Sequence, residues 1–174
     1  MSIKNVVTMA LALLMAASPV PVNARETVTG RASVVDGDTI DIGTVRIRFN
    51  GIDAPESWQR CKQSTRKAYR CGKEAAFALD SFLAASRPTT CRLIEKEVGH
   101  EGKRWIGECF RLDGADVNRW LVRNGWALDW PKYSGGRYAP EHAGAKPKGV
   151  GIWRGSFESP CVARAKRMKR TPNC

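Results

Sequence analysis

The alternation of apolar and polar side chains predicts short β-strands in the first third of the chain. Residues 27–35 alternate β-branched with small side chains, and Val45, Ile47 and Phe49 alternate with polar neighbours. This period of two is typical of strands with one buried face. Turn signals at residues 36–38 and at Gly43 separate these segments from a third, residues 39–42. We therefore expect a three-stranded meander.

The period changes after the third predicted strand, which Pro55 ends because proline cannot donate to a strand ladder. A polar, basic loop is expected at residues 60–70. A helix over residues 72–85 has one apolar stripe, formed by Ala75, Ala76, Leu79, Phe82 and Leu83. Residues 115–124 predict a second helix, with Asp116 near its start and Gly125 as its C-terminal cap.

Two more strands, residues 90–97 and 104–112, surround a turn at residues 99–102. A third helix is expected from about Pro140, although glycine and proline weaken its pattern. Five short strands with about three helices predict an α+β fold. The five-stranded OB-fold β-barrel is the economical choice, and this barrel commonly presents a face to nucleic acid.

The first 24 residues have the pattern of a secretory signal peptide. Lys4 precedes an apolar run over residues 6–17, and Ala24 ends a small-residue cleavage pattern. An uncleaved N-terminal anchor is the alternative. We accordingly divide the chain into a signal peptide (1–24), the OB-fold domain (25–160) and a basic C-terminal tail (161–174), in which we expect residues 164–170 to be solvated. We expect an exported protein, periplasmic or secreted, that is a monomer and does not associate with a membrane after signal removal.

All six cysteines follow the predicted cleavage site, and an even number in an exported chain suggests disulfides. Cys91 and Cys109 lie symmetrically about the predicted turn, so they could face each other across a hairpin. We favour local pairing for the others also, Cys61 with Cys71 and Cys161 with Cys174. A zinc site is the competing interpretation, which the absence of any CxxC spacing disfavours.

The charge balance is strongly basic, with 29 Lys and Arg against 17 Asp and Glu and a formal net charge of +12. Such an excess favours a polyanionic partner, because each cation that neutralises a phosphate releases a condensed counterion. An anionic membrane surface or simple solubility would also account for the charge.

Within this basic chain, three carboxylates lie near turns or strand ends: Asp38, Asp53 and Glu56. Two converging aspartates suit a hard cation such as calcium. Arg48 and Arg104 could grip a phosphodiester beside it, and Glu56 could orient or deprotonate a water. Taken one at a time, each residue also has an ordinary interpretation as turn chemistry or a solvated charge.

Taken together, these segments resemble the staphylococcal-nuclease-like (thermonuclease) family, over about residues 28–157. The resemblance is carried, in order, by Val35-Asp36-Gly37-Asp38-Thr39, the segment from Arg48 to Glu56, Gly72-Lys73-Glu74-Ala75, Gly102-Lys103-Arg104, Asp116-Val117-Asn118, the segment from Leu121 to Gly125, and Gly151-Ile152-Trp153.

The resemblance implies an OB-fold barrel with three helices and calcium-dependent hydrolysis of DNA and RNA to 3′-phosphate products. Its metal ligands match Asp38, Asp53 and the backbone carbonyl of Ala54, where the family uses threonine. Its catalytic residues match Arg48, Glu56 and Arg104. Gly102 also departs from the pattern, because a tyrosine that helps to hold the nucleotide commonly stands there.

Two other classes of function stay open. A non-catalytic, nucleic-acid-binding OB-fold module would explain the charge, but it has no use for three carboxylates beside phosphate. A cell-surface adhesin or protein-interaction domain would leave the five charged positions free to vary. Four aromatic residues among basic ones have two interpretations, base stacking or packing of the late helix on the barrel: Trp126, Trp130, Tyr133 and Tyr138.

Overall fold

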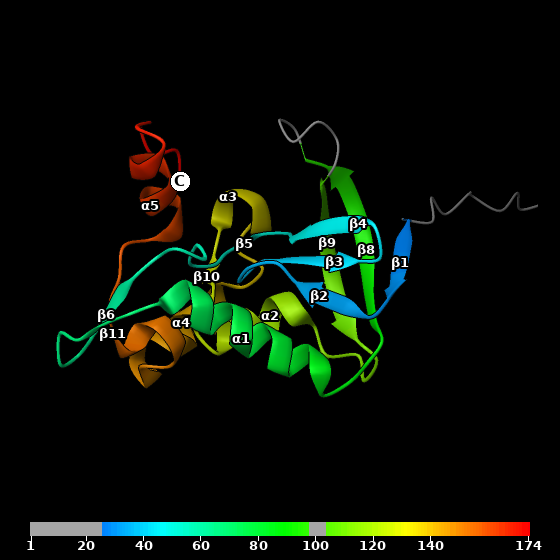
Figure 1. Cartoon of the computed structure of the whole chain (residues 1–174), viewed down its shortest axis with the longest axis horizontal. Coiled ribbons are helices and arrows are strands. Elements are labelled where there is room, and N and C mark those ends of the chain that lie inside the picture. Colours follow the sequence, from blue (N-terminus) through cyan, green and yellow to red (C-terminus); the bar gives the residue numbers. More distant parts are fainter. Residues whose placement is uncertain (1–25, 98–103) are drawn as a thin grey trace, which may run out of the picture.

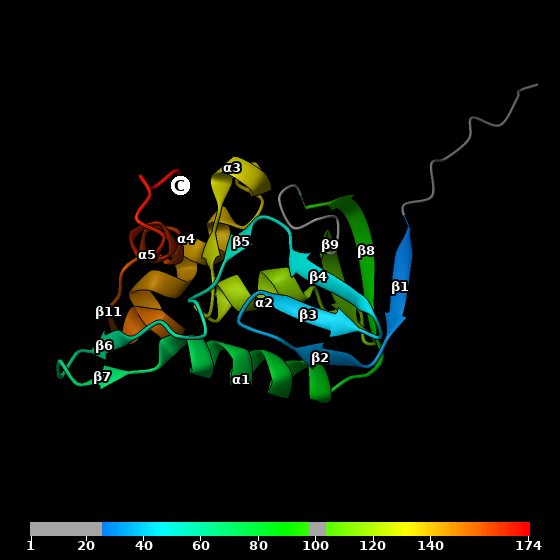
Figure 2. The ribbon, with the colours of Figure 1, turned by 45° about the horizontal axis from the view of Figure 1, so that its top comes forward.

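The structure, a computed structural model, describes residues 26–97 and 104–174. The predicted signal peptide, the turn at residues 99–102 and Gly102 therefore lie outside the described residues. Figures 1 and 2 show a curled sheet at one side of the molecule and helices along its edge and at its other end.

The main sheet has six strands in the order β1-β8-β9-β4-β3-β2. Neighbours are antiparallel except for β4 and β9, which are parallel. The strands are β1 (Thr27–Gly30), β2 (Ala32–Val34), β3 (Thr39–Ile42), β4 (Val45–Phe49), β8 (Thr89–Lys96) and β9 (Arg104–Arg111).

The first predicted strand is two strands, β1 and β2, with only Arg31 between them. β1 pairs with β8 and β2 pairs with β3, so one interrupted segment joins both edges of the curled sheet. Counted as one, this segment gives the five-stranded connectivity that we predicted for an OB-fold barrel. The α+β, OB-fold prediction is confirmed, with a larger number of separate strands.

The barrel core is formed by the inward-facing positions of the alternating pattern. Ile40, Ile47 and Phe49 are almost completely buried, and removal of such side chains from water is the main force for folding. Cys91 and Cys109 lie opposite each other on β8 and β9 and form a disulfide within this core. The strand pairing therefore also brings these two cysteines together.

The three expected helices are present as α1 (Cys71–Ala84), α2 (Val117–Arg123) and α4 (Ala139–Lys148). The stripe of α1 is buried through Leu79 and Leu83, and Asp116 caps α2 by accepting a hydrogen bond from the Arg119 backbone N–H at 2.9 Å. Two short helices, α3 (Pro131–Ser134) and α5 (Pro160–Arg167), and the 3-10 helix η1 (Gly151–Arg154) were not predicted. Within the described residues, no helix is long and apolar enough to cross a membrane.

The predicted polar loop at residues 60–70 contains a small hairpin, β6 (Cys61–Gln63) and β7 (Ala68–Tyr69), which β11 (Gly155–Ser156) extends to three strands. A separate pair joins β5 (Ile52–Asp53) to β10 (Leu128–Asp129). All three predicted disulfides are confirmed, and no free cysteine remains for a zinc site: Cys61–Cys71, Cys91–Cys109 and Cys161–Cys174.

Candidate active site

The turn before β3 places Asp38 beside the end of β4. The Asp38 backbone N–H donates to Asp36 Oδ1 at 3.0 Å, and the Phe49 backbone N–H donates to the Asp38 carbonyl at 2.8 Å. Since Thr39 is paired with Arg48 across the two strands, the Arg48 guanidinium reaches the preceding aspartate. Its Nη2 lies 3.0 Å from Asp38 Oδ2.

Asp53 arrives at the same place from the end of β5. Its Oδ1 lies 3.5 Å from the same Nη2 atom of Arg48, and the next residue, Ala54, donates its backbone N–H to Asp38 Oδ2 at 3.2 Å. Both aspartates are only 4% exposed. The predicted convergence of Asp38 and Asp53 across fifteen positions is therefore confirmed.

Burial makes two carboxylates of this cluster, Asp53 and Asp36, harder to ionise. It raises the pKa of Asp53, although the charge of Arg164 and a hydrogen bond from it act in the opposite direction. Burial and the nearby charge of Asp38 raise the pKa of Asp36 to about 6. The cluster of Asp36, Asp38 and Asp53 is thus tolerated in the fold because cationic partners compensate it.

Glu56 follows Pro55 on a loop that is held from two sides. Its backbone N–H donates to Gln59 Oε1 at 3.2 Å, and Gln59 Nε2 donates to the Glu158 carbonyl at 2.7 Å. The start of α1 packs directly on the loop: a Cβ added at Gly72 would lie 1.7 Å from the Glu56 carbonyl oxygen. Only glycine allows this approach, so the first turn of α1 and the loop that carries Asp53 and Glu56 hold each other in a fixed position.

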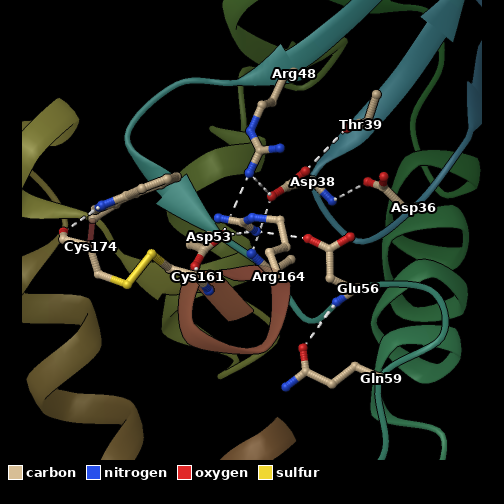
Figure 3. A network of polar contacts seen from close by, with 12 residues as sticks. Asp36, Asp38, Thr39, Arg48, Asp53, Glu56, Gln59, Cys161, Arg164 and Cys174 are labelled. Atoms are coloured by element: carbon tan, nitrogen blue, oxygen red, sulfur yellow. Dashed lines mark hydrogen bonds and ion pairs between the residues drawn. A yellow bond between two sulfur atoms is a disulfide. The ribbon is translucent and has the colours of Figure 1, made fainter. Parts of the chain in front are cut away.

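The C-terminal helix brings a further cation into the cluster. Arg164 Nη1 lies 2.6 Å from Asp53 Oδ1 and 2.8 Å from Glu56 Oε1, and its side chain is 19% exposed. Figure 3 shows Arg48 and Arg164 approaching the aspartates together, with Glu56 beside Arg164. The prediction that residues 164–170 are a solvated tail is wrong for Arg164, because α5 folds back against the site.

A pocket of about 640 Å³ opens next to this cluster. Arg48, Glu56 and Arg104 all line it, so the three predicted catalytic side chains face one space. Arg104 comes from the start of β9 and forms an ion pair with Glu97. Asp38 and Asp53 are almost fully buried and do not line the pocket, but their arginine partners Arg48 and Arg164 do.

The aromatic residues divide between the two interpretations. Trp126 packs on the barrel core and Tyr138 is buried, with 1% of its surface exposed. Trp130 and Tyr133 instead line the pocket, in edge-to-face contact with ring centroids 4.6 Å apart. Tyr133 is 54% exposed. Packing therefore explains the first pair, and the second pair is placed where a base could stack.

The donor set of Asp38 and Asp53 is chemically suited to a hard divalent cation, which prefers carboxylate oxygens. Both carboxylates contact one Arg48 nitrogen, so their oxygens lie near each other. In the part of the chain that the structure describes, no three acidic, histidine or cysteine side chains are grouped closely enough to hold a metal. A cation here would need additional oxygens, such as the Ala54 carbonyl, water and substrate phosphate.

Sequence reasoning missed Arg164 and Gln59. A signal for the first was available, since Ser159-Pro160 is a typical helix start, and Cys161 and Ala165, four positions apart on α5, are both buried. The pattern predicts that helix, but no local signal says which distant surface it contacts. Gln59 lies just before the predicted polar loop at residues 60–70, and its role depends on the Glu158 carbonyl from far along the chain.

Comparison with known proteins gives a consistent result. The staphylococcal nuclease homologue family matches residues 46–155. A succinoglycan biosynthesis protein, ExoI, from Rhizobium meliloti is 48% identical over 151 residues, covering 87% of this chain and 78% of that protein. Endonuclease YhcR of Bacillus subtilis is 32% identical over 89% of this chain, which spans only 14% of that longer protein. An uncharacterized endonuclease from Escherichia coli O157:H7 is 30% identical, covering 58% of this chain and 60% of its own length.

Proposed function

Because the chain belongs to the staphylococcal nuclease homologue family, we propose that it is an exported, calcium-dependent nuclease that hydrolyses phosphodiester bonds of DNA, RNA or both. Family membership supports nuclease activity in general. The cation, the substrate and the location are the specific parts of the proposal.

The observation that carries the proposal is the meeting of carboxylates and guanidinium groups at one pocket. Asp38 comes from the turn before β3, and Asp53 and Glu56 come from the end of β5 and the loop after it. Each contacts an arginine of the same cluster. Arg48 and Arg104 line the pocket together with Glu56. A module that only binds nucleic acid gains nothing from acidic groups here, because they repel phosphate.

In the proposed reaction, a water attacks phosphorus in line with the leaving oxygen. Glu56 holds this water through its carboxylate and accepts its proton. Arg48 and Arg104 donate hydrogen bonds to the phosphate oxygens, and their fixed charges stabilise the additional negative charge of the five-coordinate transition state. The P–O5′ bond breaks and the leaving O5′ takes up a proton from solvent water, which gives a 3′-phosphate and a 5′-hydroxyl.

Asp38, Asp53 and the Ala54 carbonyl are the groups that would hold the calcium ion. When bound, the ion supplies positive charge toward a phosphate oxygen. The alanine at position 54 is compatible with this role, because the ligand is a backbone atom and does not require the threonine side chain.

The pocket also offers cationic and aromatic groups that can contact nucleic acid. Among the described residues, its charged side chains are equally divided, Arg48, Lys96, Arg104 and Arg164 against Asp36, Glu56, Glu95 and Glu97. Lys96 lines the pocket together with Arg48 and Arg104, and such positive charges can contact a phosphate backbone. Trp130 and Tyr133 line the same pocket and offer aromatic faces. We assign these two residues to base stacking.

Export is supported by the cysteines and by the N-terminal sequence pattern. Every cysteine is paired, and disulfides persist in oxidising compartments. Residues 1–24, which lie outside the described residues, supply the predicted signal peptide.

The test is cleavage of DNA and RNA by the oxidised, purified protein in calcium and in a chelator. We expect cleavage only in calcium, and a loss of about 10²–10⁴-fold for Glu56→Gln, the range that general acid–base groups contribute. Arg48→Ala should lose a similar factor, as expected for removal of a donor to the transition state.

Two matched variants control for charge and folding. Arg46→Ala removes an arginine from the same strand that pairs with Asp41 outside the pocket, and Asp80→Asn removes an exposed carboxylate of α1. Both should cleave like the wild type. If the wild type cuts nothing in calcium while still binding DNA in a salt-dependent way, the protein is a binding module and the nuclease proposal fails.

A further inference from the structure

The position of Arg164 is not explained by the nuclease mechanism above. It lies on α5, beyond the residues that the family match covers, and its partners Asp53 and Glu56 are more than a hundred positions earlier in the chain. One nitrogen, Nη1, contacts both carboxylates. A single cationic group thus joins a proposed cation ligand to the proposed general base.

Several contacts fix α5 in this position. The Cys161 backbone N–H donates to Asp53 Oδ2 at 2.8 Å, and Cys161 is bonded to Cys174. The Cys174 carbonyl in turn accepts a hydrogen bond from the Trp130 indole N–H at 2.9 Å, and the Arg164 guanidinium lies 5.4 Å from the centre of the Trp130 ring. Figure 3 shows the disulfide beside the cluster. The contact of Arg164 with Asp53 is therefore part of a closed, cross-linked arrangement.

This arrangement places a positive group on the oxygen that a divalent cation would use. Asp53 Oδ1 lies against Arg164 at 2.6 Å and against Arg48 at 3.5 Å, while Oδ2 accepts the Cys161 N–H. Calcium binds oxygen ligands at about 2.3–2.6 Å. A calcium ion on Oδ1 would therefore lie within a few ångströms of the Arg164 charge. Like charges at that separation in a largely buried site repel strongly.

We propose that Arg164 is the resident counter-cation of the acidic site, and that a divalent cation binds Asp53 only by displacing it. This inference rests on the proposed function, because it concerns the same cation site. On this proposal, α5 lowers the affinity of the site for calcium, because it carries the competing charge. Arg48 is the weaker partner of Asp53, at 3.5 Å, because its guanidinium is held closer to Asp38, at 3.0 Å.

The test is titration of Ca²⁺ into nucleic-acid-free protein by calorimetry, with Arg164→Gln as the decisive variant. Removal of the competing charge should lower the Ca²⁺ dissociation constant by about tenfold or more. Arg164→Lys keeps a positive charge at the position and should stay close to the wild type. Arg167→Gln removes the same charge one turn further along α5, where the guanidinium stacks on Trp58 at 4.5 Å, and should leave the dissociation constant within about twofold.

A second measurement covers the case in which Arg164→Gln is too unstable to titrate. A ligand that binds the native state raises Tm according to its affinity, so the calcium-induced rise in Tm should be larger for Arg164→Gln than for the wild type. An unchanged or weaker Ca²⁺ affinity in Arg164→Gln overturns the proposal, and so does the absence of Ca²⁺ binding in both proteins.

These readouts are independent of cleavage. A protein that exchanges Arg164 for calcium but cuts no nucleic acid would contradict the nuclease proposal alone. A protein that cuts in calcium, with equal calcium affinity in the wild type and Arg164→Gln, would contradict the counter-cation proposal alone.

Discussion

The closest approach between backbone segments at the site gives a sharp prediction for Gly72→Ala. A Cβ at this position would lie 1.7 Å from the Glu56 carbonyl oxygen, 2.5 Å from its carbonyl carbon and 3.1 Å from the Pro55 carbonyl oxygen. Contacts under 3.0 Å essentially never occur for a real Cβ. Two backbones meet here, so no flexible side chain can turn aside, and either α1 or the Asp53–Glu56 loop has to move by more than an ångström.

The size of the effect follows from that displacement. Forcing an additional methyl group into a packed site typically costs about 1–3 kcal/mol. For a chain of this size, each kcal/mol lowers Tm by about 2–4 °C, so the expected loss is about 2–12 °C. The same shift moves the Glu56 carboxylate, and a misplacement of about 1 Å can lower a reaction rate by about 10²-fold.

Calorimetric Tm and the initial rate of DNA cleavage would be measured on Gly72→Ala beside Gly144→Ala. Gly144 lies inside α4 with nothing within 4 Å of an added Cβ. Its substitution should stabilise the protein by up to about 1 kcal/mol, because alanine is the better helix former, and leave the rate unchanged. If Gly72→Ala melts at the wild-type temperature and cleaves at the wild-type rate, the reasoning about this contact is refuted.

Two further predictions concern the fold around the site. Asn118 donates to the Asn50 carbonyl at 2.9 Å and accepts the Cys109 N–H at 3.3 Å, so Asn118→Leu leaves both buried groups without a partner and should lower the free energy of unfolding by about 2–4 kcal/mol in chemical denaturation. The control Asn173→Leu, at an exposed position, should change it little. Equal stabilities of the two variants would contradict the role of this bridge. His142 accepts the Asp129 backbone N–H at 3.1 Å, and burial lowers its pKa below the ordinary value of 6.5. The stabilisation by neutral His142 is therefore complete above pH 6.5 and declines below it. As the pH falls from 7.5 to 5, the difference in Tm between the wild type and His142→Gln should shrink. A constant difference would contradict the role of neutral His142 as an acceptor.

The sequence was sufficient for the barrel and for the two aspartates because the relevant signals are local. The period-two pattern defines each strand, and the Asp36-Gly37-Asp38 turn sets how β2 meets β3. Once β3 and β4 pair, the position of Asp38 beside Arg48 follows from strand register. Asp53 then needs only the few residues after β4 to reach the same point. The cysteine pairs were predictable for the same reason, since each joins residues close in sequence.

The parts that could not be predicted depend on contacts between distant segments. The interruption of the first strand at Arg31 follows Gly30, which permits a bend but does not say that the chain changes partners there. The break occurs because one segment has to reach both β8 and β3 as the sheet curls. Similarly, the run from Arg164 to Arg170 has the composition of a solvated tail. Arg164 is drawn into the site by Asp53, more than a hundred positions earlier in the chain, because a buried carboxylate is stabilised by a cationic partner.

The positions of two disulfides connect the cysteine chemistry to the site. Cys71 is bonded to Cys61 and immediately precedes Gly72, the residue packed on the Glu56 carbonyl. Cys161 is bonded to Cys174 and gives its backbone N–H to Asp53. Each cross-link therefore shortens the free chain around one support of the carboxylate loop, which lowers the conformational entropy that would otherwise oppose its order. A loop that buries a carboxylate benefits from such support, and disulfides persist in an oxidising compartment. The proposed export and the proposed chemistry are therefore consistent with the same two cross-links.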